Sequence, residues 1–178
     1  MLSFIDFEEE LEDLVTFLTS NTWEFHGDSN PSAEKIIKNF EEGFYNGEDT
    51  KTFWILLNDE LKIGVLRIFD LTDSTPLFDI RISNAYRGKG IGVKVIQWLT
   101  NHIFTQYKMI NRIEGYTRQD NYAMRTVFYK CNFVKEAYHR RSWKDRDGNL
   151  YDSVGYCILR EDWMKNETTI IDWNDFKY

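Results

Sequence analysis

The sequence predicts an α/β fold, built as one domain over residues 1–178, because strand-like and helix-like patterns alternate along the chain. Residues 77–82 alternate apolar and charged side chains, which is the period of a half-buried strand. Residues 90–105 follow with apolar side chains at helical spacing. The chain is 42% hydrophobic and has only two prolines, so it can bury a sizeable core and no linker is expected.

The N-terminal third is expected to hold two amphipathic helices, Glu8–Thr19 and Ser32–Tyr45. The acidic run 8–13 is interpreted as the solvated face of the first helix, although it could instead attract an amine. Ser32 is a suitable N-cap for the second helix. Only residues 2–5 precede the acidic run, so the first strand is expected to be short or missing.

The later elements follow from the same two periods and from the turn residues between them. Strands are expected at Thr52–Leu57, Lys62–Asp70, Leu77–Ile82, Arg112–Thr117, Phe133–Trp143 and Ser153–Arg160. Tight turns are expected at 58–60 and 144–149. Asp120 or Asn121 should cap a helix that ends near Cys131, where Asn132 can adopt the left-handed backbone that ends a helix.

Composition and charge restrict the partners of the chain. The formal net charge of −7 argues against a nucleic-acid surface and favours a cationic acceptor. The longest charge-free apolar run, 52–57, is too short to cross a membrane, and the N-terminus lacks the basic start of a signal peptide. A cytoplasmic location and no membrane partner are therefore expected. Cys131 and Cys157 lack metal-ligand spacing, so we expect no metal and two buried, reduced thiols.

The glycine-rich stretch 87–92, with the sequence Arg-Gly-Lys-Gly-Ile-Gly, lies between a predicted strand and a predicted helix. Glycine lets the backbone approach a ligand closely, and the first amides of the helix can bind a phosphate. A nucleotide-hydrolase loop would need Ser or Thr after Gly88-Lys89, where Gly90 stands. The glycine spacing also differs from the dinucleotide-binding pattern. A phosphorylated cofactor of another kind is therefore expected.

A second motif accompanies the first: residues 121–133 begin with Asn121 and form a helix that ends in an Asn-Phe pair. Together the two motifs resemble the GNAT superfamily of N-acetyltransferases, whose acyl-CoA loop has Arg87, Gly90 and Gly92 at its signature positions. The resemblance covers roughly residues 50–160, and it most resembles the branch of ribosomal-protein N-terminal acetyltransferases and some aminoglycoside acetyltransferases. It implies a central mixed, mostly antiparallel sheet of six or seven strands, splayed at the acyl-CoA site and flanked by about four helices.

The resemblance implies an enzyme that moves an acetyl group from acetyl-CoA to a primary amine by direct attack in a ternary complex. Backbone groups near Ile80 and Ile82 on the cofactor strand are then expected to hold the pantetheine arm. Asn121 is expected to reach the same arm, although it could act only as a helix cap. The cofactor-binding residues expected overall are Ile80, Ile82, Arg87, Gly88, Lys89, Gly90, Ile91, Gly92, Val93, Asn121 and Phe128. Homodimerisation is left open.

The acid that protonates the leaving thiolate is hard to find in the sequence. Phe128 and Met124 occupy the two positions where relatives of the implied family carry a candidate Tyr or Ser. Tyr129 is one residue beyond Phe128, about 100° around the helix, and either it or a water could serve. The candidate bases that would deprotonate the amine are Asp79, Glu24, His26 and Glu114.

The acceptor is expected to lie between residues 23–30 and 141–152. Trp23, Phe25, Trp143 and Tyr151 could form an aromatic pocket for a cation, or they could be ordinary core residues. A small amine, an aminoglycoside-like compound and a protein N-terminus all remain open. The alternatives to an enzyme are a non-catalytic acyl-CoA sensor and, less favoured, an interaction protein that binds no cofactor.

Overall fold

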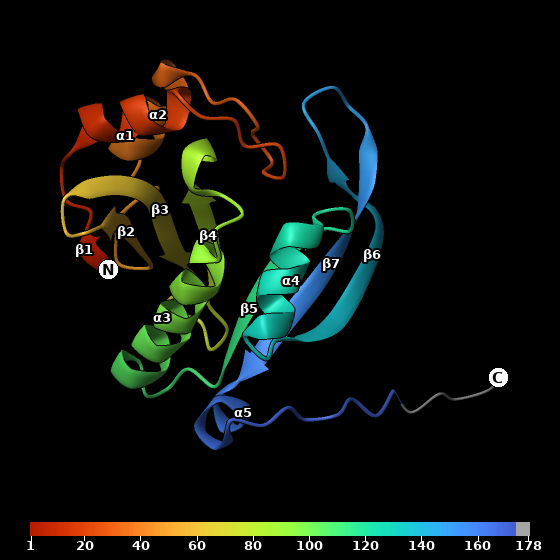
Figure 1. Ribbon diagram of the computed structural model, residues 1–178. Coiled ribbons are helices and arrows are strands. Elements are labelled where there is room, and N and C mark those ends of the chain that lie inside the picture. Colours follow the sequence, from red (N-terminus) through yellow and green to blue (C-terminus); the bar gives the residue numbers. More distant parts are fainter. Residues whose placement is uncertain (174–178) are drawn as a thin grey trace.

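A computed structural model describes residues 1–173 of the chain, and its seven strands form two antiparallel sheets (Figure 1). The first sheet has the order β1-β2-β3-β4 and the second the order β5-β7-β6. The strands are β1 Leu2–Asp6, β2 Thr50–Leu57, β3 Leu61–Phe69, β4 Leu77–Ile82, β5 Arg112–Arg118, β6 Val134–Lys144 and β7 Leu150–Leu159. The expected α/β fold with a splayed, mostly antiparallel sheet is confirmed, and the splay divides the sheet in two.

Five α-helices and one 3₁₀ turn accompany the strands in the described part of the chain. They are α1 Leu11–Thr19, α2 Ala33–Glu41, the 3₁₀ turn Asn84–Tyr86, α3 Ile91–Gln106, α4 Tyr122–Lys130 and α5 Arg160–Lys165. The short helix α5 was not predicted, and its first residue, Arg160, was assigned to the preceding strand. The other four helices lie where the periodicity placed them.

Both N-terminal helices are shorter than predicted. Helix α1 begins at Leu11 rather than Glu8, since the Glu10 carboxylate already accepts a hydrogen bond from the Glu8 amide, 3.0 Å away, ahead of the helix. Helix α2 ends at Glu41, shortly before Gly43, whose φ of +74° breaks the helical path. Its N-cap is as predicted: the Ser32 hydroxyl accepts a hydrogen bond from the Lys35 amide at 3.3 Å.

The first strand is present and short, which is one of the two expected outcomes. All five residues of β1 pair with β2, from Leu2 opposite Leu57 to Asp6 opposite Phe53. The predicted turn after β2 is also observed, with positive φ at Asn58 and Asp59, as tight hairpins require.

The first sheet lies between two helical layers. One core packs α1 and α2 on one sheet face and includes Trp54, Leu56 and Val65. The other core packs α3 and α4 on the opposite face and includes Leu66 and Ile68 together with residues of the second sheet. Because successive residues of β2 and β3 enter the two cores in turn, both faces of these strands are covered and their sequences are nearly continuous apolar runs.

The two sheets meet at β4 and β5, and there the ladder is broken. Within residues 1–173, one backbone hydrogen bond joins them, from the Glu114 amide to the Pro76 carbonyl at 3.1 Å. Beyond it the two strands diverge, with α3 and α4 on one side of the gap (Figure 1). The edge of β4 along this gap therefore has no partner strand.

The two cysteines are free and buried, as predicted. Burial raises the pKa of the Cys131 thiol to about 11 and that of Cys157 to about 12, so both stay protonated near neutral pH. Among the described residues, no helix is both long and apolar enough to cross a membrane.

Candidate active site

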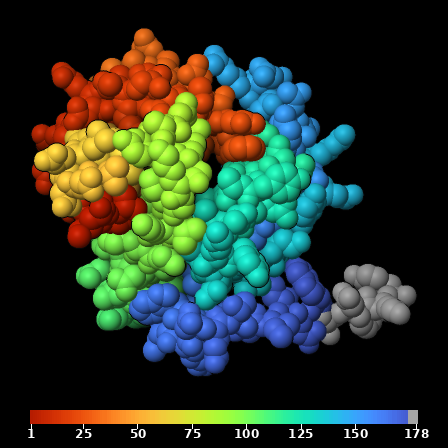
Figure 2. All heavy atoms as spheres, viewed as in Figure 1, coloured from red at the N-terminus to blue at the C-terminus, as the bar shows by residue number. Residues whose placement is uncertain are grey.

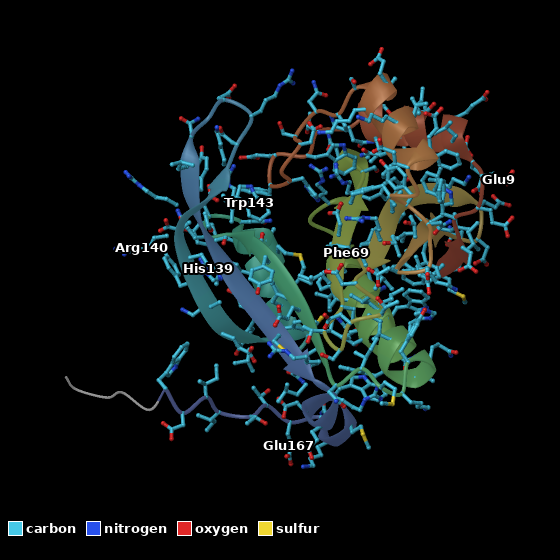
Figure 3. All side chains as sticks on the ribbon, turned by 180° about the vertical axis from the view of Figure 1, so that it is seen from behind. Glu9, Phe69, His139, Arg140, Trp143 and Glu167 are labelled. Atoms are coloured by element: carbon cyan, nitrogen blue, oxygen red, sulfur yellow. The ribbon has the colours of Figure 1, made fainter. Side chains whose placement is uncertain are left out.

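A cavity of about 610 Å³ opens where the two sheets diverge. Its walls come from β3, β4, β5, α2, α4 and the connection between α1 and α2, residues 20–32. Figure 2 shows this orange connection lying against the teal region of α4, so it covers one end of the gap. Trp143 of β6 also lines the cavity. Figure 3 shows it on the inner side of this strand and Arg140 on the outer side.

One face of the β3–β4 pair supplies charged residues to the cavity. Asp79 and Arg81 are two residues apart on β4 and therefore share a face. Arg67 on β3 lies directly opposite Asp79 in the register. Sequence reasoning selected Asp79 but missed both arginines. A signal was present, because Arg67 interrupts the apolar run of a strand that is covered on both faces.

Asp79 is held between two cationic or hydrogen-bonding partners. His26 Nε2 lies 3.1 Å from Asp79 Oδ1, and Arg81 Nε lies 3.0 Å from Asp79 Oδ2. Burial by itself raises the pKa of Asp79, but the charges and hydrogen bonds of His26 and Arg81 outweigh burial and hold this pKa well below its usual range. Asp79 is therefore ionised throughout the neutral range and is a poor proton acceptor.

The surroundings of His26 fix its tautomer. Nε2 also lies 3.2 Å from the Ile80 carbonyl oxygen, and both of its neighbours are acceptors, so Nε2 carries a hydrogen and donates. Nδ1 is buried and has no hydrogen-bond partner among the described residues. In the neutral imidazole this nitrogen keeps its lone pair, so His26 can accept a proton. The His26–Asp79 pair has the arrangement of a base and the group that orients it.

The glycine loop has the geometry of a phosphate cradle. Gly88 and Gly90 have φ of +74° and +75°, and a Cβ added at either would meet no atom within 4 Å. Gly90 is the N-cap of α3 and provides no capping side chain, so the first amides of a 16-residue helix face outward. These residues fit a pyrophosphate group. Side chains at 88 or 90 would fill the same space.

The Arg87 side chain binds protein rather than open space. Its Nε donates to the Ile82 carbonyl at 2.8 Å, and its Nη2 donates to the Thr22 carbonyl at 2.6 Å. Arg87 thus ties the glycine loop to β4 and to the start of the α1–α2 connection. Lys89 lies over the Tyr86 ring, with its Nζ 5.1 Å from the ring centroid.

Helix α4 presents Asn121 and Phe128 to the cavity, whereas Tyr129 is 82% exposed and is not a lining residue. The Asn121 side chain caps α4 by accepting from the Met124 amide at 3.1 Å, and its amide group donates to Thr117 Oγ1 at 2.9 Å. The predicted cap is confirmed. Phe128 is buried and stacks on Tyr156, with ring centroids 4.5 Å apart.

Two of the candidate bases lie outside the cavity lining. Glu114 pairs with Arg112 and accepts a hydrogen bond from Tyr116 at 3.0 Å. Its side chain projects from the face of β5 opposite that of its neighbour Gly115, which packs against Phe128. Glu24 contributes its backbone carbonyl, which accepts from Arg118 at 3.5 Å.

The four aromatic residues expected near the acceptor have different surroundings. Trp23 is a core residue, 1% exposed. Phe25 and Trp143 line the cavity. The Tyr151 ring, together with Phe25, already holds a protein cation, since the Arg118 guanidinium carbon lies 3.8 Å from the Tyr151 centroid and 4.9 Å from that of Phe25. Phe25 and Tyr151 therefore already contact a cation of the protein itself, Arg118, in place of a ligand cation.

Comparison with protein families gives one match, the acetyltransferase (GNAT) domain, which extends over residues 2–134. The chain belongs to the GNAT acetyltransferase family. It is accordingly an acetyl-CoA-dependent N-acetyltransferase, and acetyl-CoA is its acyl donor. No curated protein matches the chain in sequence.

Solved structures share the fold at low sequence identity. Spermidine N-acetyltransferase from Vibrio cholerae, in complex with CoA and spermine, is 16% identical, with a TM-score of 0.78 over 92% of this chain and 98% of that one. A dodecameric form of the same enzyme is 17% identical, with a TM-score of 0.76 over 93% and 97%. A probable acetyltransferase is 19% identical, with a TM-score of 0.75 over 91% and 94%. At these identities the likeness concerns the fold.

Proposed function

We propose that this acetyltransferase acylates the primary amine of a small acceptor that enters the cavity between the two sheets. The pyrophosphate of acetyl-CoA would lie against the amides of residues 88–93, and the pantetheine arm would follow the open edge of β4 near Ile80 and Ile82. The observation that carries this proposal is the continuity of the open β4 edge with a cavity that contains a polarised histidine.

His26 is the base in this proposal, and Asp79 is a positioning residue. Nε2 of His26 is occupied by Asp79 and Ile80, so we assign the proton of the incoming ammonium group to Nδ1, which is buried here and must be uncovered by the bound acceptor. The neutral amine nitrogen then attacks the thioester carbonyl, a C–N bond forms and the C–S bond breaks. The nitrogen loses its remaining extra proton as the thiolate gains one, and water carries this proton from nitrogen to sulfur, because Phe128 and Met124 have no acidic hydrogen and Tyr129 lies on the exposed side of α4.

Glu24 and Tyr129 are weaker candidates for catalysis, since neither lines the cavity. Asn121 is expected to serve both as the cap of α4 and as a neighbour of the pantetheine arm. The Vibrio cholerae neighbours are spermidine N-acetyltransferases, which supports an amine acceptor but differs from the ribosomal-protein branch that the sequence resembles. Homodimerisation and a larger assembly like that of the dodecameric neighbour are both compatible with the fold.

An assay of CoA release with a panel of amines tests this function. The panel should contain polyamines, amino acids, an aminoglycoside and short peptides, and at least one should release CoA in proportion to acetylated amine. If the protein bound CoA in calorimetry but released none with any amine, the acyl-CoA sensor would be the better assignment. Failure to bind CoA at all would leave only an interaction protein.

A further inference from the structure

The cavity wall concentrates buried nitrogen atoms that have no hydrogen-bond partner. In residues 1–173, seven buried side-chain nitrogen or oxygen atoms lack a partner. Three of these belong to the lining of this one cavity: His26 Nδ1, Arg67 Nε and Arg81 Nη1. The two guanidinium atoms can only donate, and an unpaired buried donor of a charged group costs free energy. These atoms are shielded from the cavity space, whereas Nη2 of Arg67 and Nη2 of Arg81 are accessible and make no hydrogen bond within residues 1–173, so they are the donors open to an acceptor-rich ligand.

Arg67 is held in position without a counter-ion. Its guanidinium carbon lies 3.7 Å from the centroid of Phe44 and 4.2 Å from that of Phe69, so two rings fix its plane. Its Nη1 donates to the Phe44 carbonyl at 3.3 Å. Within residues 1–173, no carboxylate lies within ion-pair distance of it. Burial lowers the pKa of Arg67, which means that the site would favour an added negative charge.

Arg81 completes the same surface. Its side chain is 17% exposed, and Nε is used by Asp79, while Nη1 has no partner. Its guanidinium carbon lies 5.3 Å from the Trp23 centroid, so Arg81 is also held over an aromatic ring. Val65 lies opposite Arg81 in the β3–β4 register and Arg67 lies opposite Asp79, so the two arginines come from neighbouring strands on one face.

The charges of the lining do not cancel. Lys35, Arg67 and Arg81 face two carboxylates, Asp28 and Asp79. Both carboxylates are already paired, Asp28 with Lys35 at 2.7 Å and Asp79 with Arg81 and His26. With His26 in the neutral form that the proposed base requires, one positive charge, that of Arg67, is therefore left for a ligand. A diamine would bring a second ammonium group toward this charge, which is unfavourable.

We propose that the acceptor is a small amine that also bears a carboxylate, and that Arg67 and Arg81 bind this carboxylate while His26 receives the amine. The assignment rests on the proposed amine acetyltransferase function. Two guanidinium groups on neighbouring strands offer donors to both oxygens of one carboxylate, the geometry in which arginine binds such groups most strongly. A single negative charge also matches the one unbalanced positive charge of the wall.

Matched acceptors test the proposal in the unmodified protein. Each set contains an amino acid, its amide and the amine that lacks the acid group, with both α-amino and ω-amino acids and an aminoalkyl phosphate included. We expect kcat/KM for CoA release to be at least about 30-fold higher for the acid than for its amide, since an unpaired buried charge costs at least this factor. Equal rates for acid and amide, or preference for polyamines or the phosphate, would overturn the proposal.

Substitutions of Arg67 test whether this residue causes the preference for the acid. Arg67→Gln should remove the preference for the acid and leave KM for acetyl-CoA unchanged, whereas Arg67→Lys should retain part of the preference. Arg140→Gln is the matched control, because Arg140 is an exposed arginine on the outer side of β6 (Figure 3). An unchanged acid preference in folded Arg67→Gln would refute the role of this residue. If the variant did not fold, the comparison of acid and amide in the unmodified protein would still decide.

A binding measurement separates this proposal from the catalytic one. Calorimetry with the same acids and amides, in the presence of CoA, reports carboxylate binding without turnover. Binding of acids but not amides, with no CoA release from any amine, would retain the carboxylate site and reject the acetyltransfer role. Equal release of CoA with acids and amides would retain the acetyltransfer role and reject the carboxylate site.

Discussion

At the residue scale, the structure changes how the cavity carboxylate is interpreted. Asp79 was a candidate base from its place on the cofactor strand, but a carboxylate that is ion-paired to Arg81 and His26 has little affinity for a proton. The unpaired nitrogen of His26 is the better acceptor. Sequence alone could not show this, because His26 and Ile80 are 54 residues apart and the α1–α2 connection has no periodic pattern.

Replacing the proposed base gives the first prediction. His26→Gln keeps a donor that can reach Asp79 but removes the proton acceptor, so kcat should fall by about 10²–10⁴ while KM for acetyl-CoA is unchanged. Steady-state kinetics at fixed acceptor measures both constants. His139→Gln, at an exposed histidine of β6, serves as the control and should retain full activity. A loss below about tenfold in folded His26→Gln would show that another group takes the proton.

Asp79→Asn should lower stability in a way that depends on pH. The folded-state pKa of Asp79 is depressed, so its contribution is fully present above the unfolded pKa of about 3.9 and is lost as the pH falls toward the folded pKa. We expect the substitution to reduce the free energy of unfolding by about 1.5–3 kcal/mol at pH 7 and by progressively less below pH about 4. Urea unfolding of both proteins across this range measures the difference. A difference that grew on acidification below pH 4 would contradict the assigned sign.

A third residue-scale prediction concerns the glycine loop. Gly90→Glu should abolish CoA binding in calorimetry, because its side chain would occupy the phosphate space and add a negative charge. Gly148→Glu is the control, since Gly148 also has a positive φ, +87°, but lies in the β6–β7 turn. Both variants should carry similar backbone strain of about 1–2 kcal/mol, and only the first should lose CoA. Normal CoA affinity in folded Gly90→Glu would remove the loop from the site.

At the element scale, one glycine sets how closely α4 packs on β5. A Cβ on Gly115 would lie 2.7 Å from Phe128 Cζ and 2.9 Å from Phe78 Cζ. These rings come from α4 and β4, so this glycine lets three elements meet where the sheets diverge. The requirement explains why a glycine stands in the middle of a strand, which otherwise weakens it.

Gly115→Ala should therefore reduce the free energy of unfolding by about 1–3 kcal/mol through overpacking, measured by urea denaturation. Gly27→Ala is the matched control, because a Cβ there would meet no atom within 4 Å. That control should change stability by no more than about 0.5 kcal/mol. If both substitutions had equally small effects, the aromatic rings would have room to move and the junction would be looser than described.

The elements themselves were largely predictable, because each depends on short-range periodicity. β4 is found at the predicted residues 77–82, and the caps at Ser32 and Asn121 follow from local side-chain chemistry. Errors occurred at boundaries where one element follows another without a loop, as where β7 ends at Leu159 and α5 begins at Arg160. The site was predictable only in part: the glycine loop has a local signature, whereas Arg67 gains its role from strand register and from rings that are distant in sequence.

At the scale of the whole molecule, the two sheets form halves. Within residues 1–173 they are joined by one backbone hydrogen bond, from Glu114 of β5 to Pro76 just before β4, and by the helices packed across them. A CoA molecule bound along β4 and against the start of α3 and α4 would contact both halves. Ligand binding to the native state alone stabilises that state by about 2.7 kcal/mol at one hundred times the dissociation constant. For a chain of this size that corresponds to a rise in Tm of about 5–10 °C.

The last prediction is that CoA raises Tm by this amount and slows amide hydrogen exchange in β4 and β5 together. Slowed exchange in both strands is required, because a ligand that bridges the halves must suppress their separation, whereas a ligand held by one half protects only that half. Gly90→Glu should show neither effect at the same CoA concentration. A rise in Tm with protection confined to β4 and α3 would mean that CoA binds the first sheet alone, and the cavity between the sheets would then not be organised by the acyl donor.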